Sequence, residues 1–261
     1  SYRLAGRTEK AWTVPIGPVD EQTLYRVRAT VTGPHQTGLV RERWMGGFAG
    51  VPRAAASPSV DGRPDESAWK QAARLKLEER RQFCERKEKN REAWNGPDDL
   101  SGTVMLCWDE RALYVGAIVT DDRFVHEYRD DMLWSGDGIQ FMIDPFRHRT
   151  DSEGFFVCSA AHGTAGDQTW IHHAPLPGLP VGEGTDIAFA SSPAPDGNGR
   201  RYELAVPWEL LQPFEPAPGA NLGFSVIINE DDGASRQSWL TWFSGVSSKQ
   251  VAQVGDLVLT E

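Results

Sequence analysis

Cysteine is scarce in this chain, and positively charged residues are in deficit. The three cysteines, Cys84, Cys107 and Cys158, include no C-x-x-C pair, so their spacing does not suggest a zinc site. Lysine and arginine together number 27 against 37 aspartate and glutamate residues, which gives a formal net charge of −10. Because phosphate groups are bound by a basic surface, this balance argues against a nucleic-acid partner.

Long apolar runs are missing too. No stretch of about 18 apolar residues occurs, so the sequence predicts no membrane span. The chain begins at Ser1 without the apolar core of a signal peptide, and we expect a mature or excised piece whose sequence is silent on export. Hydrophobic residues still make up 39% of the chain and aromatic residues 10%, which is enough for a packed core and excludes wholesale disorder.

Short strand-like segments dominate the rest of the chain. Val104–Trp108 and Leu113–Val119 flank the turn Asp-Glu-Arg-Ala, which predicts an antiparallel hairpin. In Ile139–Asp144 the residues Ile139, Phe141 and Ile143 alternate with Gln140, Met142 and Asp144. This alternation predicts a strand that covers the core with one face and presents the other outward.

The same pattern continues to the end of the chain with hardly any helix. Asp65 is a good N-cap for a short helix that Trp69 would anchor, and Pro207 opens a second helical turn. The charged segment 78–93 is expected to be a solvated helix or an edge excursion. Strands at this spacing predict an all-β fold, an antiparallel β-sandwich of immunoglobulin-like or jelly-roll-like form with a few short helical turns. The further expected strands are 154–161, 167–172, 187–190, 202–206, 222–229, 238–242 and 256–259.

Residues 1–48 stand apart from this pattern. Ala11–Val14, Leu24–Val31 and Leu39–Trp44 resemble three short strands, too few to bury a core alone. They fit either strands from a preceding β domain or an N-terminal extension of the main domain. The glycine-rich segment 46–50 is the natural junction. We therefore expect one part over 1–48 and a β-sandwich domain over 49–261.

The segment WDERALYVGAIVTDD, followed by WSGDGIQFMID, resembles carbohydrate-binding module family 9, a calcium-containing β-sandwich related to the DOMON fold. Further blocks in the family's order are VDGRPDESAWKQA upstream and YELAVPWELL, LGFSVIINEDD and VGDLVL downstream. The resemblance implies a non-catalytic module that binds an oligosaccharide or polysaccharide and targets a larger polysaccharide-degrading or cell-surface protein to it. It also implies a secreted or extracytoplasmic protein whose other domains are partners of this one.

The resemblance also indicates sugar-binding residues. Trp134 matches the family's stacking tryptophan, and an indole offers an apolar plane on which a pyranose ring stacks. Gln140 matches a position where the family carries a carboxylate that hydrogen-bonds sugar hydroxyls, and an amide can both donate and accept. Ser159 and Trp170 complete the expected carbohydrate-binding set. The competing interpretations are that Trp134 belongs to the core and that Gln140 is an ordinary exposed strand residue.

Two departures from the family support a second hypothesis. The family clamps its sugar between two tryptophans, and the loop that would hold the second one, 244–250, contains no aromatic residue. On the second hairpin, Val157 and Ser159 stand where the family has stronger polar contacts. The alternative functions are therefore a structural or interaction β-sandwich that has lost sugar binding, or an accessory part of a glycoside hydrolase or polysaccharide lyase.

Calcium is the cofactor that the resemblance implies. Asp61, Asp65 and Asp256 match strand ends that lie together at one edge of the family's fold, and Asp231 and Asp232 are further candidates. Calcium takes roughly six to eight oxygen ligands, which acidic loops supply. The competing interpretation is that these acidic loops are simply solvated.

Catalytic interpretations rank below binding. A glycosidase needs two carboxyl groups about 5 to 10 Å apart across a cleft. The nearest carboxylate pairs here are adjacent in sequence, Asp121 with Asp122 and Asp130 with Asp131. No nucleophile motif accompanies the histidines His162, His172 and His173. We therefore expect no enzymatic activity.

Haem binding is a third hypothesis, because some DOMON-related domains hold haem through methionine and histidine. The candidate ligands in this chain are Met132, Met142 and His162.

Overall fold

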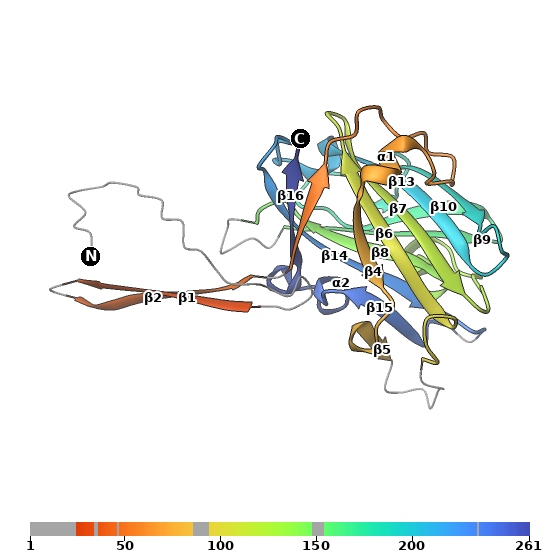
Figure 1. The fold of residues 1–261 in the computed structure, drawn as a ribbon, viewed down its shortest axis with the longest axis horizontal. Helices are drawn as coiled ribbons and strands as arrows, with labels where there is room; N and C mark the ends of the chain where they lie inside the picture. Colours follow the sequence, from red (N-terminus) through yellow and green to blue (C-terminus); the bar gives the residue numbers. More distant parts are fainter. Residues whose placement is uncertain (1–24, 34–35, 46, 86–93, 148–153, 234) are drawn as a thin grey trace.

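The computed structural model of this chain describes residues 25–33, 36–45, 47–85, 94–147, 154–233 and 235–261, with side chains from residue 47 on. These residues form two β-sheets packed face to face, from which the hairpin of β1, Tyr25–Gly33, and β2, Gln36–Met45, projects (Figure 1). The structure confirms the all-β sandwich and the scarcity of helix that the sequence pattern predicts.

The smaller sheet has five strands in the order β12-β13-β7-β6-β4 in the described part of the chain. Its centre is the predicted hairpin, in which Cys107 lies opposite Tyr114. The middle strand is buried at nearly every position, as apolar residues on both of its faces require. The bounds are β4 Ala73–Leu77, β6 Leu100–Trp108, β7 Ala112–Asp121, β12 Ala188–Pro193 and β13 Arg200–Pro207.

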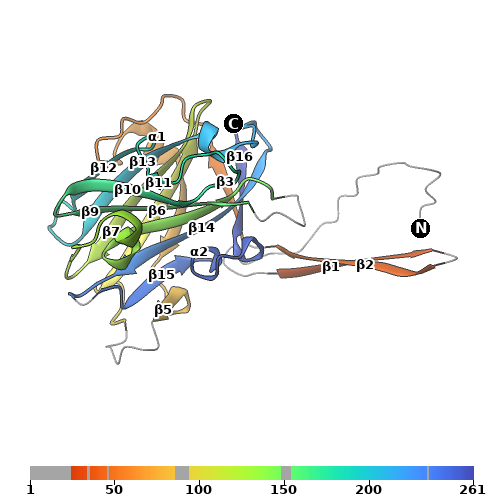
Figure 2. The same ribbon diagram turned by 180° about the vertical axis from the view of Figure 1, so that it is seen from behind.

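The larger sheet follows the order β11-β10-β9-β8-β14-β15-β5 among the described residues, with β16 beside β14 and β3 beside β16 (Figure 2). The pair β3 and β16 is parallel, whereas the other strand pairs of this sheet are antiparallel. The bounds are β3 Phe48–Pro52, β5 Phe83–Glu85, β8 Gly138–Asp144, β9 Phe156–Gly163, β10 Gly166–His173, β11 Gly182–Glu183, β14 Asn221–Glu230, β15 Ser238–Trp242 and β16 Gly255–Thr260.

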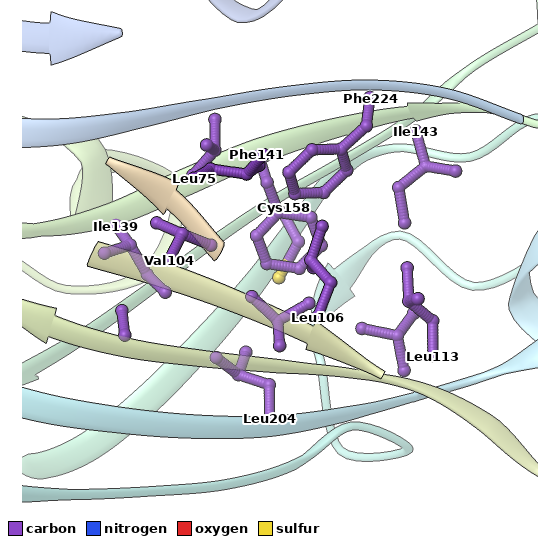
Figure 3. Close-up of a cluster of buried hydrophobic side chains, with 14 of the residues drawn as sticks. Leu75, Val104, Leu106, Leu113, Ile139, Phe141, Ile143, Cys158, Leu204 and Phe224 are labelled. Atoms are coloured by element: carbon purple, nitrogen blue, oxygen red, sulfur yellow. The ribbon is translucent and has the colours of Figure 1, made fainter. Parts of the chain in front are cut away.

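The core lies between the two sheets. In the larger sheet Phe141 pairs with Cys158 on one side and with Val226 on the other, so these apolar side chains share the inner face. They meet Val104, Leu106 and Leu204 from the smaller sheet, and Figure 3 shows Phe141, Cys158 and Leu106 converging in this layer. All of them are at most 1% exposed, so hydrophobic burial is the main force that holds the sheets together.

Short helices close the edges of the sandwich. The N-cap position of helix α1, Ser67–Gln71, is Glu66, whose side chain makes no cap hydrogen bond, so the predicted cap at Asp65 is wrong by one residue. Trp69 anchors it as expected: the indole is 1% exposed and lies against Gly116 of β7. A Cβ atom at position 116 would come within 2.9 Å of the Trp69 ring, so this close approach requires glycine. The remaining short helices are η1 Arg80–Gln82, η2 Asp130–Ser135, η3 Trp208–Leu211, α2 Gly245–Ser248 and η4 Val251–Gln253.

The sequence pattern predicts most strands but misses four. Strands β3, β4, β5 and β11 were not expected, because each has five residues or fewer and lies at or near a sheet edge. Segment 78–93 contains η1 and β5 rather than one long helix, and its residues 86–93 lie outside the described part. The expected strand Ala11–Val14 also lies outside the described residues. No helix in the described ranges is long and apolar enough to cross a membrane.

Candidate functional site

Three of the four predicted sugar-binding residues form one row on the outer face of the larger sheet. Trp170 on β10 pairs with Ser159 on β9, and Ser159 pairs with Gln140 on β8. Gln140 in turn pairs with Ile227 on β14. Directly opposed residues of antiparallel strands point to the same side of a sheet, so these side chains share the face that lies away from the core. We call this surface the outer face.

Trp134, the fourth predicted residue, lies on the 3-10 helix η2, which contacts β8, β9 and β10. The loop expected here is therefore a short helix. The buried carboxylate of Asp137 fixes its C-terminal side by accepting hydrogen bonds from the backbone N–H groups of Val125 and Asp231. Burial and the neighbouring Asp121 carboxylate raise the pKa of Asp137. Trp134 is thus held between the start of β8 and the turn that follows β14.

Gln140 is less exposed than the alternation predicts. Its side chain lies on the outer face, but the residue is only 4% exposed. Part of this face is covered by α2, whose Val246 packs with Met142 and Ile227 in a small apolar cluster. Gln140 therefore lies beside this apolar cluster rather than in open solvent.

Ser159 and His172 form the next polar pair of the outer face. The Ser159 hydroxyl lies 2.8 Å from Nε2 of His172, and Ser159 is 1% exposed. Burial and the nearby Lys249 ammonium lower the pKa of His172 to about 4, against a smaller opposite effect of Asp131. His172 is therefore neutral at pH 7, and it can donate or accept a hydrogen bond.

Trp134 already has one protein partner on its ring. The guanidinium carbon of Arg236 lies 4.7 Å from the Trp134 ring centre and 4.6 Å from that of Trp239, and both are cation–π contacts. Arg236 also donates a hydrogen bond to the side-chain oxygen of Asn229 at 3.0 Å. One face of the Trp134 ring is therefore covered by Arg236, and a ligand would stack on the opposite face.

Trp170 lines a separate cleft of about 310 Å³ at the β10–β11 edge of the larger sheet. Phe189 and Glu183 share this cleft, and Asp130 of η2 reaches it as well. An aromatic ring among carboxylates can contact both the apolar faces and the hydroxyl groups of a sugar. Trp170 is the residue that links this cleft to the row of Ser159 and Gln140.

The three aspartates expected to hold calcium do not come together. Asp256 is buried in an ion pair with Arg147, with contacts of 2.6 and 3.0 Å. Asp61 accepts a hydrogen bond from the backbone of Arg63, and Asp65 is exposed. These aspartates form no three-carboxylate group in the ranges that the structure covers. The three aspartates therefore have separate environments in the described part of the chain.

A different carboxylate group has the geometry of a cation site. The carboxylate oxygens of Asp99, Asp122 and Glu230 lie within 4.8 Å of one another, beside a small cavity of about 130 Å³. Glu230 is 3% exposed, and both of its carboxylate oxygens are buried without a hydrogen bond. Burial and the Asp121, Asp232, Asp99 and Asp122 carboxylates raise the pKa of Glu230 to about 10. We call this group the carboxylate cluster.

The residues considered for catalysis or haem binding have other environments. Asp121 is buried and accepts the backbone N–H of Arg123, whereas Asp130 and Asp131 are exposed on η2. His162 lies 2.7 Å from Asp167. Met142 is buried in the apolar cluster under α2, and Met132 is 43% exposed.

Sequence reasoning missed Arg236, Lys249 and the carboxylate cluster. Arg236 reaches Trp134 only because the turn after β14 folds back onto η2, a contact between residues about a hundred positions apart. Glu230 ends an otherwise apolar strand and begins the run Glu-Asp-Asp, and this change from apolar to acidic was the available signal. Lys249 lies in the loop 244–250, where only the absence of an aromatic residue was noted.

Comparison with known proteins agrees with this architecture. The solved structure of a carbohydrate binding module family 9 from Caldicellulosiruptor kristjanssonii in complex with cellotriose is 17% identical, with a TM-score of 0.59 over 82% of this chain and 93% of that chain. A second solved structure of a carbohydrate binding module family 9 from the same organism, in complex with glucose, is 16% identical, with a TM-score of 0.52 over 80% of this chain and 95% of that chain. No curated protein matches this chain.

The family assignment comes from a broader match. The family model described as "Carbohydrate family 9 binding domain-like" matches residues 60–261, more than three quarters of the chain, in line with the sequence resemblance. This result confirms the predicted non-catalytic, carbohydrate-binding function. The chain belongs to the carbohydrate family 9 binding domain-like family.

Proposed function

We propose that this module binds its saccharide on the outer face of the larger sheet, between η2 and α2. The observation that carries the proposal is the row of Trp170, Ser159 and Gln140, which are paired across β10, β9 and β8 on this face. Their indole, hydroxyl and amide groups can contact both the apolar faces and the hydroxyl groups of a sugar. Trp134 would stack on the ring, and Ser159 with His172 would bind further hydroxyls.

We further propose that the module acts as part of a larger secreted or extracytoplasmic protein that degrades or holds a polysaccharide. The family supports this role, and the cellotriose and glucose in two similar structures support a glucan chain or its end as the first ligand to test. Trp170 and its cleft would extend the surface for a longer oligosaccharide.

Isothermal titration calorimetry against a panel of neutral and acidic oligosaccharides tests the proposed site. Loss of one stacked ring or one buried hydrogen-bond partner corresponds to about a tenfold loss of affinity, so we expect that loss in Trp134→Ala and Gln140→Ala. Trp134→Phe keeps an aromatic plane and should lose less. Gln71→Ala, an exposed glutamine on α1, is the matched control. Wild-type affinity in both Trp134→Ala and Gln140→Ala would exclude the outer face as the site.

We also propose a structural calcium ion at the carboxylate cluster of Asp99, Asp122 and Glu230. The two unpartnered oxygens of Glu230 support this proposal, because a buried carboxylate is stable only when it is paired or bound to a cation. Carboxylate oxygens suit a hard cation such as calcium. The ion would join the 95–99 loop, the end of β7 and the end of β14.

A thermal unfolding experiment with calcium and with a chelator tests this proposal. At a free calcium concentration of about 100 times Kd, binding adds about 2.7 kcal/mol to the free energy of unfolding, which raises Tm by roughly 5–10 °C. Glu230→Gln should keep the metal-free Tm, because the amide mimics a protonated carboxyl, and should lose the calcium response. Glu209→Gln, an exposed glutamate on η3, is the control. An equal calcium response in Glu230→Gln would place the ion elsewhere.

A further inference from the structure

We propose that Arg236 is a positioning residue of the saccharide site: it holds the Trp134 indole in the orientation on which a sugar ring stacks. The inference rests on the proposed function, because Arg236 would act on the ligand only through Trp134. It goes beyond that function by giving a role in binding to a residue that does not itself touch the sugar.

The first observation is that one guanidinium group contacts two indole rings. The guanidinium carbon of Arg236 lies 4.7 Å from the Trp134 ring centre and 4.6 Å from that of Trp239. Both distances are within the range of about 6 Å over which a cation attracts an aromatic ring. Arg236 therefore joins η2, which carries Trp134, to β15, which carries Trp239. We call these three side chains the Trp–Arg–Trp cluster.

The second observation is that the larger sheet anchors Arg236. Asn229 is 1% exposed and lies directly opposite Trp239 in the pairing of β14 with β15. The side-chain oxygen of Asn229 accepts a hydrogen bond of 3.0 Å from the Arg236 guanidinium group. Trp239 packs against the apolar cluster under α2. The guanidinium group is planar and rigid, so contacts on this side fix its position for the contact with Trp134.

The third observation is that Arg236 also holds the segment that carries the ring. Its backbone N–H donates a hydrogen bond of 2.5 Å to the carbonyl oxygen of Ser135, the residue that follows Trp134. Leu133 and Ser135 are 1% and 2% exposed, whereas Trp134 between them is partly exposed. The backbone of η2 is thus fixed against the sandwich, and the Arg236 side chain adds a support for the ring itself.

A ring that is held before the ligand arrives improves binding. Immobilising a side chain on association costs the equivalent of a roughly two- to tenfold loss of affinity, and a ring held in advance avoids this loss. Because Arg236 covers one face of the Trp134 ring, the opposite face is left for the sugar. The arrangement therefore favours a rigid stacking surface.

Calorimetry with cellotriose tests the role of Arg236. Arg236→Met removes the planar cation and should weaken binding roughly two- to tenfold. Arg236→Lys keeps the charge without the planar group, so it should recover part of this loss. The matched control is Arg53→Met, which removes a cation–π contact of 5.6 Å with Trp108. Arg53 lies beside Thr260, near the start of β14, whereas Arg236 follows the end of β14, so the control should keep wild-type affinity.

Two further measurements separate positioning from a general effect on the fold. In a double-mutant cycle, adding Arg236→Met to Trp134→Ala should cause no further loss of affinity, because Arg236 acts through that ring. In nuclear magnetic resonance spectra of the free protein, Arg236→Met should shift and broaden the indole N–H signal of Trp134. Saturation with cellotriose should sharpen this signal again, because the bound sugar then holds the ring.

The possible failures are distinguishable. Wild-type affinity in Arg236→Met, with Trp134→Ala still weakened, would overturn this inference and leave the proposed sugar site intact. A further loss when Arg236→Met is added to Trp134→Ala would show that Arg236 acts other than through Trp134, which also overturns it. If Arg236→Met does not fold, Arg236→Lys takes its place in the cycle, and wild-type affinity then overturns the inference. Failure of the folded wild-type protein to bind cellotriose or any other saccharide of the panel would contradict both this inference and the proposed function.

Discussion

Removal of the Asp256 carboxylate is expected to destabilise the sandwich strongly. Arg147 and Asp256 form a bidentate ion pair, at 2.6 and 3.0 Å, with both side chains about 5% exposed or less. The guanidinium group also donates to the backbone oxygens of Val254 and Val251. In Asp256→Ala the arginine would remain buried without its carboxylate, which typically costs about 3–5 kcal/mol. At about 2–4 °C per kcal/mol, Tm should fall by roughly 6–20 °C.

Urea unfolding followed by tryptophan fluorescence and circular dichroism measures this loss. The double variant Arg147→Met with Asp256→Leu replaces the ion pair by apolar side chains, and we expect it to recover most of the lost stability. The loss in Asp256→Ala should be the same with calcium and with a chelator, because Asp256 is paired with arginine. The reasoning is refuted if Asp256→Ala lowers the free energy of unfolding by less than about 1 kcal/mol. It is also refuted if the variant and the wild-type protein become equally stable after chelation, because that is the result expected of a calcium ligand.

Two further predictions concern buried polar groups. One carboxylate oxygen of Glu203 accepts three hydrogen bonds, from the backbone N–H groups of residues 61, 62 and 63. Glu203→Gln should therefore lower the free energy of unfolding in urea by about 1–3 kcal/mol. An unfolding midpoint equal to that of the wild-type protein would contradict this role. The pKa of His172 is lowered from 6.5 to about 4 in the folded state, so its contribution to stability is present above pH 6.5 and is lost as pH falls towards 4. His172→Gln should flatten this part of the pH–stability curve, and an unchanged slope would show that another group titrates there.

The fold was predictable because its central strands carry a strong local signal. In β8, Ile139, Phe141 and Ile143 alternate with Gln140 and Met142, and the structure places the two sets on opposite faces. Local alternation does not report what covers the outer face, however. Met142 is buried by α2, which lies about a hundred residues away in sequence, so its burial could not be read from β8 alone.

The candidate site was predictable only in part for the same reason. The family resemblance supplied Trp134 and Gln140, and the strand register then placed Ser159 and Trp170 on the same row. The Arg236 contact with Trp134 and the carboxylate cluster depend on how distant turns approach each other in the folded chain. Likewise, no local pattern indicates that Asp256, one of the aspartates expected to bind calcium, has an arginine partner.

The most direct test of the sugar site is a nuclear magnetic resonance titration of the wild-type protein with the tightest-binding saccharide of the panel. The side-chain NH₂ signals of Gln140 and the indole N–H signals of Trp134 and Trp170 should shift with the binding isotherm. The side-chain signals of Gln71, on α1 at the smaller sheet, should not move. Shifts confined to α1 and the smaller sheet, with Gln140 and Trp134 unchanged, would contradict binding on the outer face.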